Sequence, residues 1–136
     1  MPSELESIFL KLRTILQMYA DGLLVTADGP SRYCLEGNVG PATLRAWSGK
    51  IRRPRIPVAW VEVQKSSVSY HLMGIYENKT LQRTLSKQLK ARMTGKTCFN
   101  FKTADDLSLA KELEHVTARA LAAFRTAGFI SNAKSA

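Results

Sequence analysis

The sequence predicts an α+β fold in which N- and C-terminal helices pack on one face of an antiparallel sheet of about five strands. Both ends of the chain repeat apolar residues at helical spacing, whereas the middle alternates apolar and polar residues as strands do. Sorted by this alternation, the strand residues form one apolar face and one mixed face. A sheet with one covered and one open face is common among antiparallel sheets.

The first helix is predicted to begin at Ser3, because Ser3 and Glu6 have the spacing of a capping box. Its apolar stripe comprises Leu5, Ile8, Phe9, Leu12, Ile15, Leu16 and Tyr19. Asp21-Gly22 ends the helix. Two short strands are then predicted over 23–27 and 32–36, joined by a tight turn.

Residues 37–57 are predicted to form a long loop, with a short strand near 44–47, because they contain three glycines, three prolines and a cluster of arginines. Long loops inside compact domains are uncommon and are often functional. The clearest strand pair follows, over 58–64 and 67–73.

Ser86 is expected to cap a short helix that runs through Leu89 and Met93 and ends at Gly95. Residues 96–101 form the fifth predicted strand. The last helix is predicted to be capped by Asp105 or Asp106 and to end at Gly128, with Phe129 folding back onto it. We expect one domain over 1–130 and a frayed tail over 131–136.

Strand alternation assigns two sets of residues to the two faces of the sheet. The apolar set, expected under the helices, comprises Val25, Tyr33, Leu35, Val61, Val63, Val68, Tyr70, Leu72, Phe99 and Phe101. The mixed set, expected on the open face, comprises Thr26, Arg32, Cys34, Glu36, Trp60, Glu62, Gln64, Ser69, His71, Met73, Cys98 and Asn100.

Positive charge is unevenly distributed along the chain, whose formal net charge is +9. No acid occurs between Gly37 and Val61, where the basic residues are Arg45, Lys50, Arg52, Arg53 and Arg55. A composition that is 45% apolar and 23% charged is that of a globular protein. The apolar stretches are too short to span a membrane, and two cysteines without CxxC spacing are expected to be reduced thiols, so we expect a cytoplasmic protein.

One ordered set of motifs resembles a known family. It consists of Val68-Ser69-Tyr70-His71-Leu72-Met73, the helix with Leu89 and Met93, and Gly95-Lys96-Thr97-Cys98-Phe99-Asn100-Phe101. This set resembles the YdhG-like domain-of-unknown-function family, whose members are frataxin-like in fold, and the resemblance covers roughly residues 58–129. It implies terminal helices on one face of an antiparallel sheet.

The chain departs from this family and from the frataxins at two places. Gly74 stands where family members often have proline. Frataxins carry an acidic ridge for iron, whereas here the first helix offers Glu4 and Glu6, with Asp21 beyond it, against Lys11 and Arg13. Because iron binding of that kind needs clustered oxygen ligands, we expect a poor iron carrier.

Three candidate sites follow from the open face and the basic loop. The first candidate is formed by His71, Cys98 and Asn100, which have the residue types of a thiol nucleophile with its base and orienting amide. The sequence shows no helix N-terminus or cationic pocket beside Cys98, which favours the alternative of a filler cysteine and a hydrogen-bonded strand histidine. Cys34, His71 and Cys98 are candidate ligands for a soft metal such as zinc, although they lack paired ligand spacing.

The third candidate combines the basic residues of 45–55 with Trp47 and with Trp60 on the open face, a pairing of cationic and stacking groups that suits nucleic acid or another polyanion. The alternative is a solvated basic surface. The sequence therefore favours a non-enzymatic binding or chaperone-like module that uses the open face, with Trp60, His71, Cys98 and Asn100 as ligand contacts. The alternatives are a metal carrier of frataxin type and a polyanion-binding module; the sequence names no cofactor.

Overall fold

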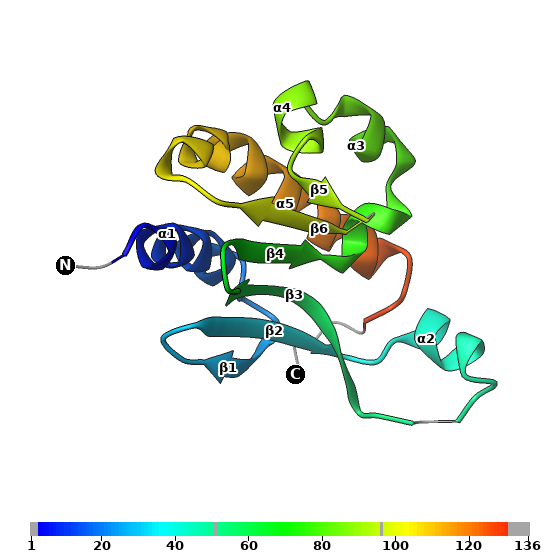
Figure 1. The fold of residues 1–136 in the computed structure, drawn as a ribbon. Helices are drawn as coiled ribbons and strands as arrows, with labels where there is room; N and C mark the ends of the chain where they lie inside the picture. The colour runs from blue at the N-terminus through cyan, green and yellow to red at the C-terminus, as the bar shows by residue number, and fades with distance from the viewer. Residues whose placement is uncertain (1–2, 51, 96, 131–136) are drawn as a thin grey trace.

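The computed structural model describes residues 3–50, 52–95 and 97–130, with the backbone alone described for Tyr76 and Glu77. Within these residues the fold is α+β, with an open antiparallel sheet in the order β1-β2-β3-β4-β6-β5 (Figure 1). The strands are β1 (Leu24–Asp28), β2 (Arg32–Asn38), β3 (Arg55–Val63), β4 (Val68–Leu72), β5 (Met93–Thr94) and β6 (Cys98–Phe101). The predicted tail, residues 131–136, lies outside the described residues.

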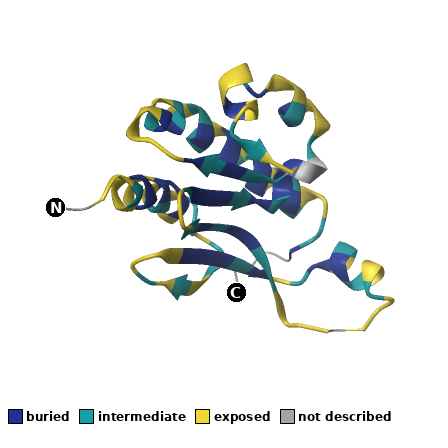
Figure 2. Ribbon diagram, in the orientation of Figure 1, coloured by how far each residue is buried: buried dark blue, intermediate teal, exposed yellow. Residues whose placement is uncertain are grey.

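The two long helices, α1 (Glu4–Met18) and α5 (Ala110–Thr126), lie on the same face of the sheet, as predicted (Figure 1). The short helices are α2 (Pro41–Ala46), η1 (Met73–Glu77), α3 (Lys79–Thr84), α4 (Lys87–Lys90) and η2 (Ala104–Leu109). The core lies between the long helices and the sheet, and Figure 2 shows the central strands as largely buried.

The predicted sorting of residues onto two faces is confirmed for the central strands. Tyr33, Val61, Tyr70 and Phe99 are successive register partners across β2, β3, β4 and β6, and all four are buried in the core with α1 and α5. Burial departs from the prediction at three residues: Val25, assigned to the covered face, is 48% exposed, whereas Cys34 and Ser69, assigned to the open face, are buried. Val25 has a simple explanation. It lies on the edge strand β1, whereas α1 packs against β3 and β4.

One polar pair is buried within the helix-covered layer. The hydroxyls of Tyr70 and Thr117 lie 2.6 Å apart, and the Thr117 hydroxyl donates to the Leu113 carbonyl at 2.7 Å. Because that bond uses the single hydroxyl proton of Thr117, Tyr70 must be the donor to Thr117. Burial raises the pKa of Tyr70 above its ordinary value of 10.0, so the donating proton stays in place.

The predicted ends of the long helices are partly confirmed. The Ser3 hydroxyl accepts from the Glu6 amide at 3.1 Å and caps α1. After α5, Gly128 adopts a φ of +84° and the Phe129 amide bonds back to the Phe124 carbonyl at 3.3 Å, as expected for a Schellman ending.

The predicted start of the last helix is wrong, because η2 precedes α5 and is capped by Thr103. Asp106 is instead the third residue of the capping box, and its carboxylate is bound by the Lys102 amide at 2.8 Å and by the Arg92 guanidinium at 2.7 Å. Burial alone would raise the pKa of Asp106, but these bonds and the charge of Arg92 together lower it.

Three further expectations are corrected. The strand expected near 44–47 is the helix α2, in which Pro41 occupies the first turn, a position that suits its missing amide hydrogen. The helix expected from Ser86 to Met93 ends at Lys90, and Met93–Thr94 pairs with β6 as a sixth strand. The helix α3 was not predicted; Asn78 caps it by accepting from the Leu81 amide.

Candidate functional site

A row of four side chains crosses the open face of the sheet. Cys34, Trp60, His71 and Cys98 are register partners in turn, on β2, β3, β4 and β6. The rings of Trp60 and His71 stack, with centroids 4.4 Å apart and planes 13° from parallel. His71 Nε2 lies 3.6 Å from Cys98 Sγ. The antiparallel register therefore brings together three of the predicted ligand contacts.

The electrostatics of this row do not favour a nucleophile. Burial lowers the pKa of His71, although the charge of Glu62 opposes this, and burial raises the pKa of the Cys98 thiol. Both groups are therefore neutral at pH 7, whereas a reactive cysteine is a thiolate. Asn100 lies outside the contact, because its amide donates to the Thr94 hydroxyl at 2.6 Å.

The three candidate metal ligands do not converge either. Cys34 is buried and pairs with Trp60, which stands between it and His71 in the register. Its thiol faces the Leu35 carbonyl at 3.9 Å. Among residues 3–50, 52–95 and 97–130, no three histidine, cysteine or acidic side chains are grouped closely enough to hold a metal ion.

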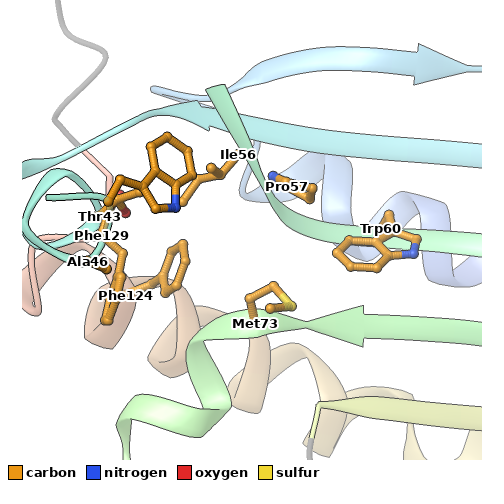
Figure 3. Close-up of a pocket in the computed structure, with 9 residues that line it drawn as sticks. Thr43, Ala46, Ile56, Pro57, Trp60, Met73, Phe124 and Phe129 are labelled. Carbon is orange, nitrogen blue, oxygen red and sulfur yellow. The ribbon is translucent and has the colours of Figure 1, made fainter. Parts of the chain in front are cut away.

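An apolar pocket of about 500 Å³ adjoins this row at Trp60, where β3 extends past β4. The last pair between these strands is Ala59 with Leu72, so residues 55–58 of β3 pair with β2 alone. Figure 3 shows side chains from β3, η1 and the end of α5 around the pocket. Its lining residues are Thr43, Ala46, Trp47, Ile56, Pro57, Trp60, Met73, Phe124 and Phe129.

One wall of the pocket is α2, which is attached to the C-terminal end of the described chain. The amides of Gly40 and Ala42 bond to the carbonyls of Phe129 and Gly128 at 2.9 and 2.8 Å, and the Thr43 hydroxyl bonds to Phe129 at 2.6 Å. A side chain at Gly40 would collide with the backbone of Gly128 and Ile130. Close backbone approach therefore requires glycine at this point.

The second wall is the end of α5 and the segment after it. The rings of Phe124 and Phe129 stack at a centroid distance of 5.2 Å, which is the hydrophobic contact that accompanies the Schellman ending. Phe124 also packs with Val58, Leu121 and Ile130 in a small core cluster of its own. The pocket is thus framed by packed elements.

The residues that line the pocket differ in their exposure to solvent. Thr43 and Phe124 are buried, Trp47 and Trp60 are half-buried, and Ala46 is exposed. Ala46, at the end of α2, is the one exposed residue of this lining, and we therefore take the mouth of the pocket to lie beside it.

We call Arg45, Lys50, Arg52, Arg53 and Arg55 the basic segment; all five are exposed. Arg45 directly precedes Ala46 and Arg55 directly precedes Ile56, so the segment flanks two lining residues in the chain. Within the described chain, Arg55 is the single member with an ion pair, to Glu36 at 3.7 Å. The polyanion site that the sequence predicts is thus contiguous with the pocket, because Trp47 belongs to both.

Sequence reasoning missed most of the pocket lining. It identified Trp47 and Trp60 but not Ile56, Met73, Phe124 or Phe129, because these come from β3, η1, α5 and the segment after α5. The available signal was Gly40-Pro41, a helix start inside a supposed loop.

Comparison with known proteins finds no matching family model, curated protein or solved structure. No helix among the described residues is both long and apolar enough to cross a bilayer.

Proposed function

We propose that this protein is a non-enzymatic binding module whose ligand occupies the apolar pocket and carries an anionic group toward the basic segment. The observation that carries the proposal is the juxtaposition of an apolar pocket, with Trp47 and Trp60 in its lining, and an acid-free stretch of exposed arginines. Small-molecule sites are typically concave, mostly apolar and few per protein.

The construction of the pocket supports a binding role. Its volume of about 500 Å³ lies within the range of about 300–1,000 Å³ that is usual for ligand pockets. Its walls are attached to each other by backbone bonds between α2 and residues 128–130. Because these walls are already held in place, the protein loses little conformational entropy when a ligand binds, and this favours affinity.

The charges support an anionic ligand. Four members of the basic segment have no ion pair among the described residues. The acids on either side of the segment in the chain, Glu36 and Glu62, already pair with Arg55 and Arg32. Exposed guanidinium groups bind carboxylates and phosphates through paired hydrogen bonds. A net charge of +9 also raises the local concentration of anions around the protein.

An enzymatic role has less support, because His71 and Cys98 form a neutral pair. Metal carriage of the frataxin kind has less support as well, because eleven acids stand against twenty lysines and arginines. Nucleic acid or another polyanion is the second ligand class, supported by the exposure of Arg52 and Arg53. The resemblance to the YdhG-like family and a cytoplasmic location stay predictions.

The test is titration with 1-anilinonaphthalene-8-sulfonate, an aromatic anion whose fluorescence rises in apolar sites. We expect one saturable site in the folded protein. Ala46→Phe, which places a ring at the mouth of the pocket, should weaken binding at least ten-fold. Ala122→Phe places the same ring at an exposed position of α5 outside the pocket and is the matched control.

Near-ultraviolet circular dichroism verifies that both variants are folded. Equal binding by wild type and by both variants would show that the dye binds elsewhere, and would contradict the proposed site.

A further inference from the structure

Resting on the proposed function, we infer that the ligand is an amphipathic monoanion, a free molecule whose hydrocarbon body fills the pocket and whose carboxylate-like head meets Arg45. The chemistry of the lining, the position of the mouth and the distribution of charge each favour this class.

The lining offers very few hydrogen-bonding groups to a ligand. Thr43 carries the single hydroxyl among the lining side chains, and its proton is already donated to the Phe129 carbonyl at 2.6 Å. The other polar side-chain atoms are the indole N–H groups of Trp47 and Trp60, which donate but do not accept. A sugar or nucleobase has several polar edges, and these would be desolvated without partners. A hydrocarbon has none.

The position of the pocket mouth indicates where the charged head group of the ligand would lie. Ala46 is the exposed lining residue, and Arg45 precedes it in the last turn of α2. Arg45 is exposed and has no ion pair within the described residues, whereas Arg55 is engaged by Glu36. Arg45 does not line the pocket, and consecutive residues of a helix point in different directions, so its side chain must reach round the end of α2 to meet a carboxylate that emerges beside Ala46. There its planar guanidinium binds both carboxylate oxygens.

The size of the pocket sets an upper limit on the hydrocarbon body. Each buried methylene should strengthen binding about four-fold, which corresponds to about 0.8 kcal/mol. This gain should stop when the pocket is full. A continued rise with chain length would instead indicate adsorption to an open surface.

The experiment is calorimetric titration with hexanoate, octanoate, decanoate and dodecanoate, each below its micelle-forming concentration. We expect the Kd to fall about four-fold per added methylene and then to reach a plateau. Arg45→Ser should weaken decanoate binding about ten-fold and leave decanol binding unchanged, because the alcohol has no charge. Arg83→Ser, a matched change at an exposed arginine of α3, should alter neither.

Two further experiments test whether nucleic acid or a membrane lipid is the ligand instead. A ten-residue oligothymidylate should fail to displace decanoate, and vesicles of an anionic phospholipid should fail to sediment the protein at physiological salt. Displacement by the oligonucleotide, sedimentation with vesicles, or equal binding of all four alkanoates would each overturn the inference.

The outcome for this ligand class is separate from the outcome for the pocket. If 1-anilinonaphthalene-8-sulfonate binds and Ala46→Phe weakens it, but the alkanoates show no dependence on chain length, the binding module stands and the amphipathic monoanion is wrong. If the dye itself is insensitive to Ala46→Phe, the proposed function fails.

Discussion

The two faces of the sheet are built from the same strands but differ in how far their side chains are buried. On the covered face, Tyr33, Val61, Tyr70 and Phe99 form a row that is buried under α1 and α5. On the open face, the adjoining row runs from Cys34 through Trp60 and His71 to Cys98, and three of its members stay half-buried.

Each member of one row is a chain neighbour of a member of the other. A shift of one residue therefore separates a position under the helices from one on the open face. The covered row is constrained by packing, whereas the open row is free to carry a thiol, an imidazole and an indole.

The largest expected effect tests the covered row. Phe99→Ala should lower the free energy of unfolding by about 3–5 kcal/mol, because it leaves a cavity in a fully buried site. Asn100→Ala, the next residue on the open face, should cost about 1 kcal/mol or less, since it loses one partly exposed hydrogen bond. Urea denaturation of both variants measures the difference, and similar costs would contradict the assignment of faces.

The buried hydroxyl pair gives a smaller and more specific test. Thr117→Val should cost about 1–3 kcal/mol, because it leaves the Tyr70 hydroxyl buried without an acceptor. Tyr70→Phe should cost about 1 kcal/mol, because Thr117 keeps its bond to Leu113. The double variant should cost less than the sum of the two. Urea denaturation measures all three, and a larger cost for Tyr70→Phe than for Thr117→Val would reverse the inferred direction of the bond.

The smallest effect concerns His71 on the open row. His71→Gln should cost roughly 1 kcal/mol at pH 8, where the stack with Trp60 is lost. The pKa of His71 is lowered in the folded state from its ordinary value of 6.5, so the unfolded chain takes up a proton first as the pH falls. Wild-type stability is therefore retained above pH 6.5 and declines below it.

The variant lacks this decline, so its deficit relative to wild type should shrink between pH 6.5 and pH 5. Urea denaturation across that range measures the deficit. A constant deficit from pH 8 to pH 5 would show that burial of the imidazole does not disfavour its protonated form.

Much of the fold is readable from the sequence because it depends on local periodicity. Period-two alternation correctly placed Trp60, His71 and Cys98 on one face, and helical spacing with Ser3 and Gly128 located the start of α1 and the end of α5. The β4–β6 contact between His71 and Cys98 is a consequence of the register, which follows from the same alternation once the strands are neighbours. Short elements were less readable, since α3 and β5 are held mainly by tertiary contacts.

The sequence by itself determined the two faces, the terminal helices and the acid-free basic segment, because each is a property of neighbours in the chain. Tertiary structure alone decided that Trp47 and Trp60 share a pocket with Phe124 and Phe129. The bond from Thr43 to Phe129 spans 86 positions, and no local pattern encodes contacts at that separation. The backbone bonds from Gly40 and Ala42 to residues 128 and 129 join segments that the sheet and α5 bring together, and they form one side of the pocket.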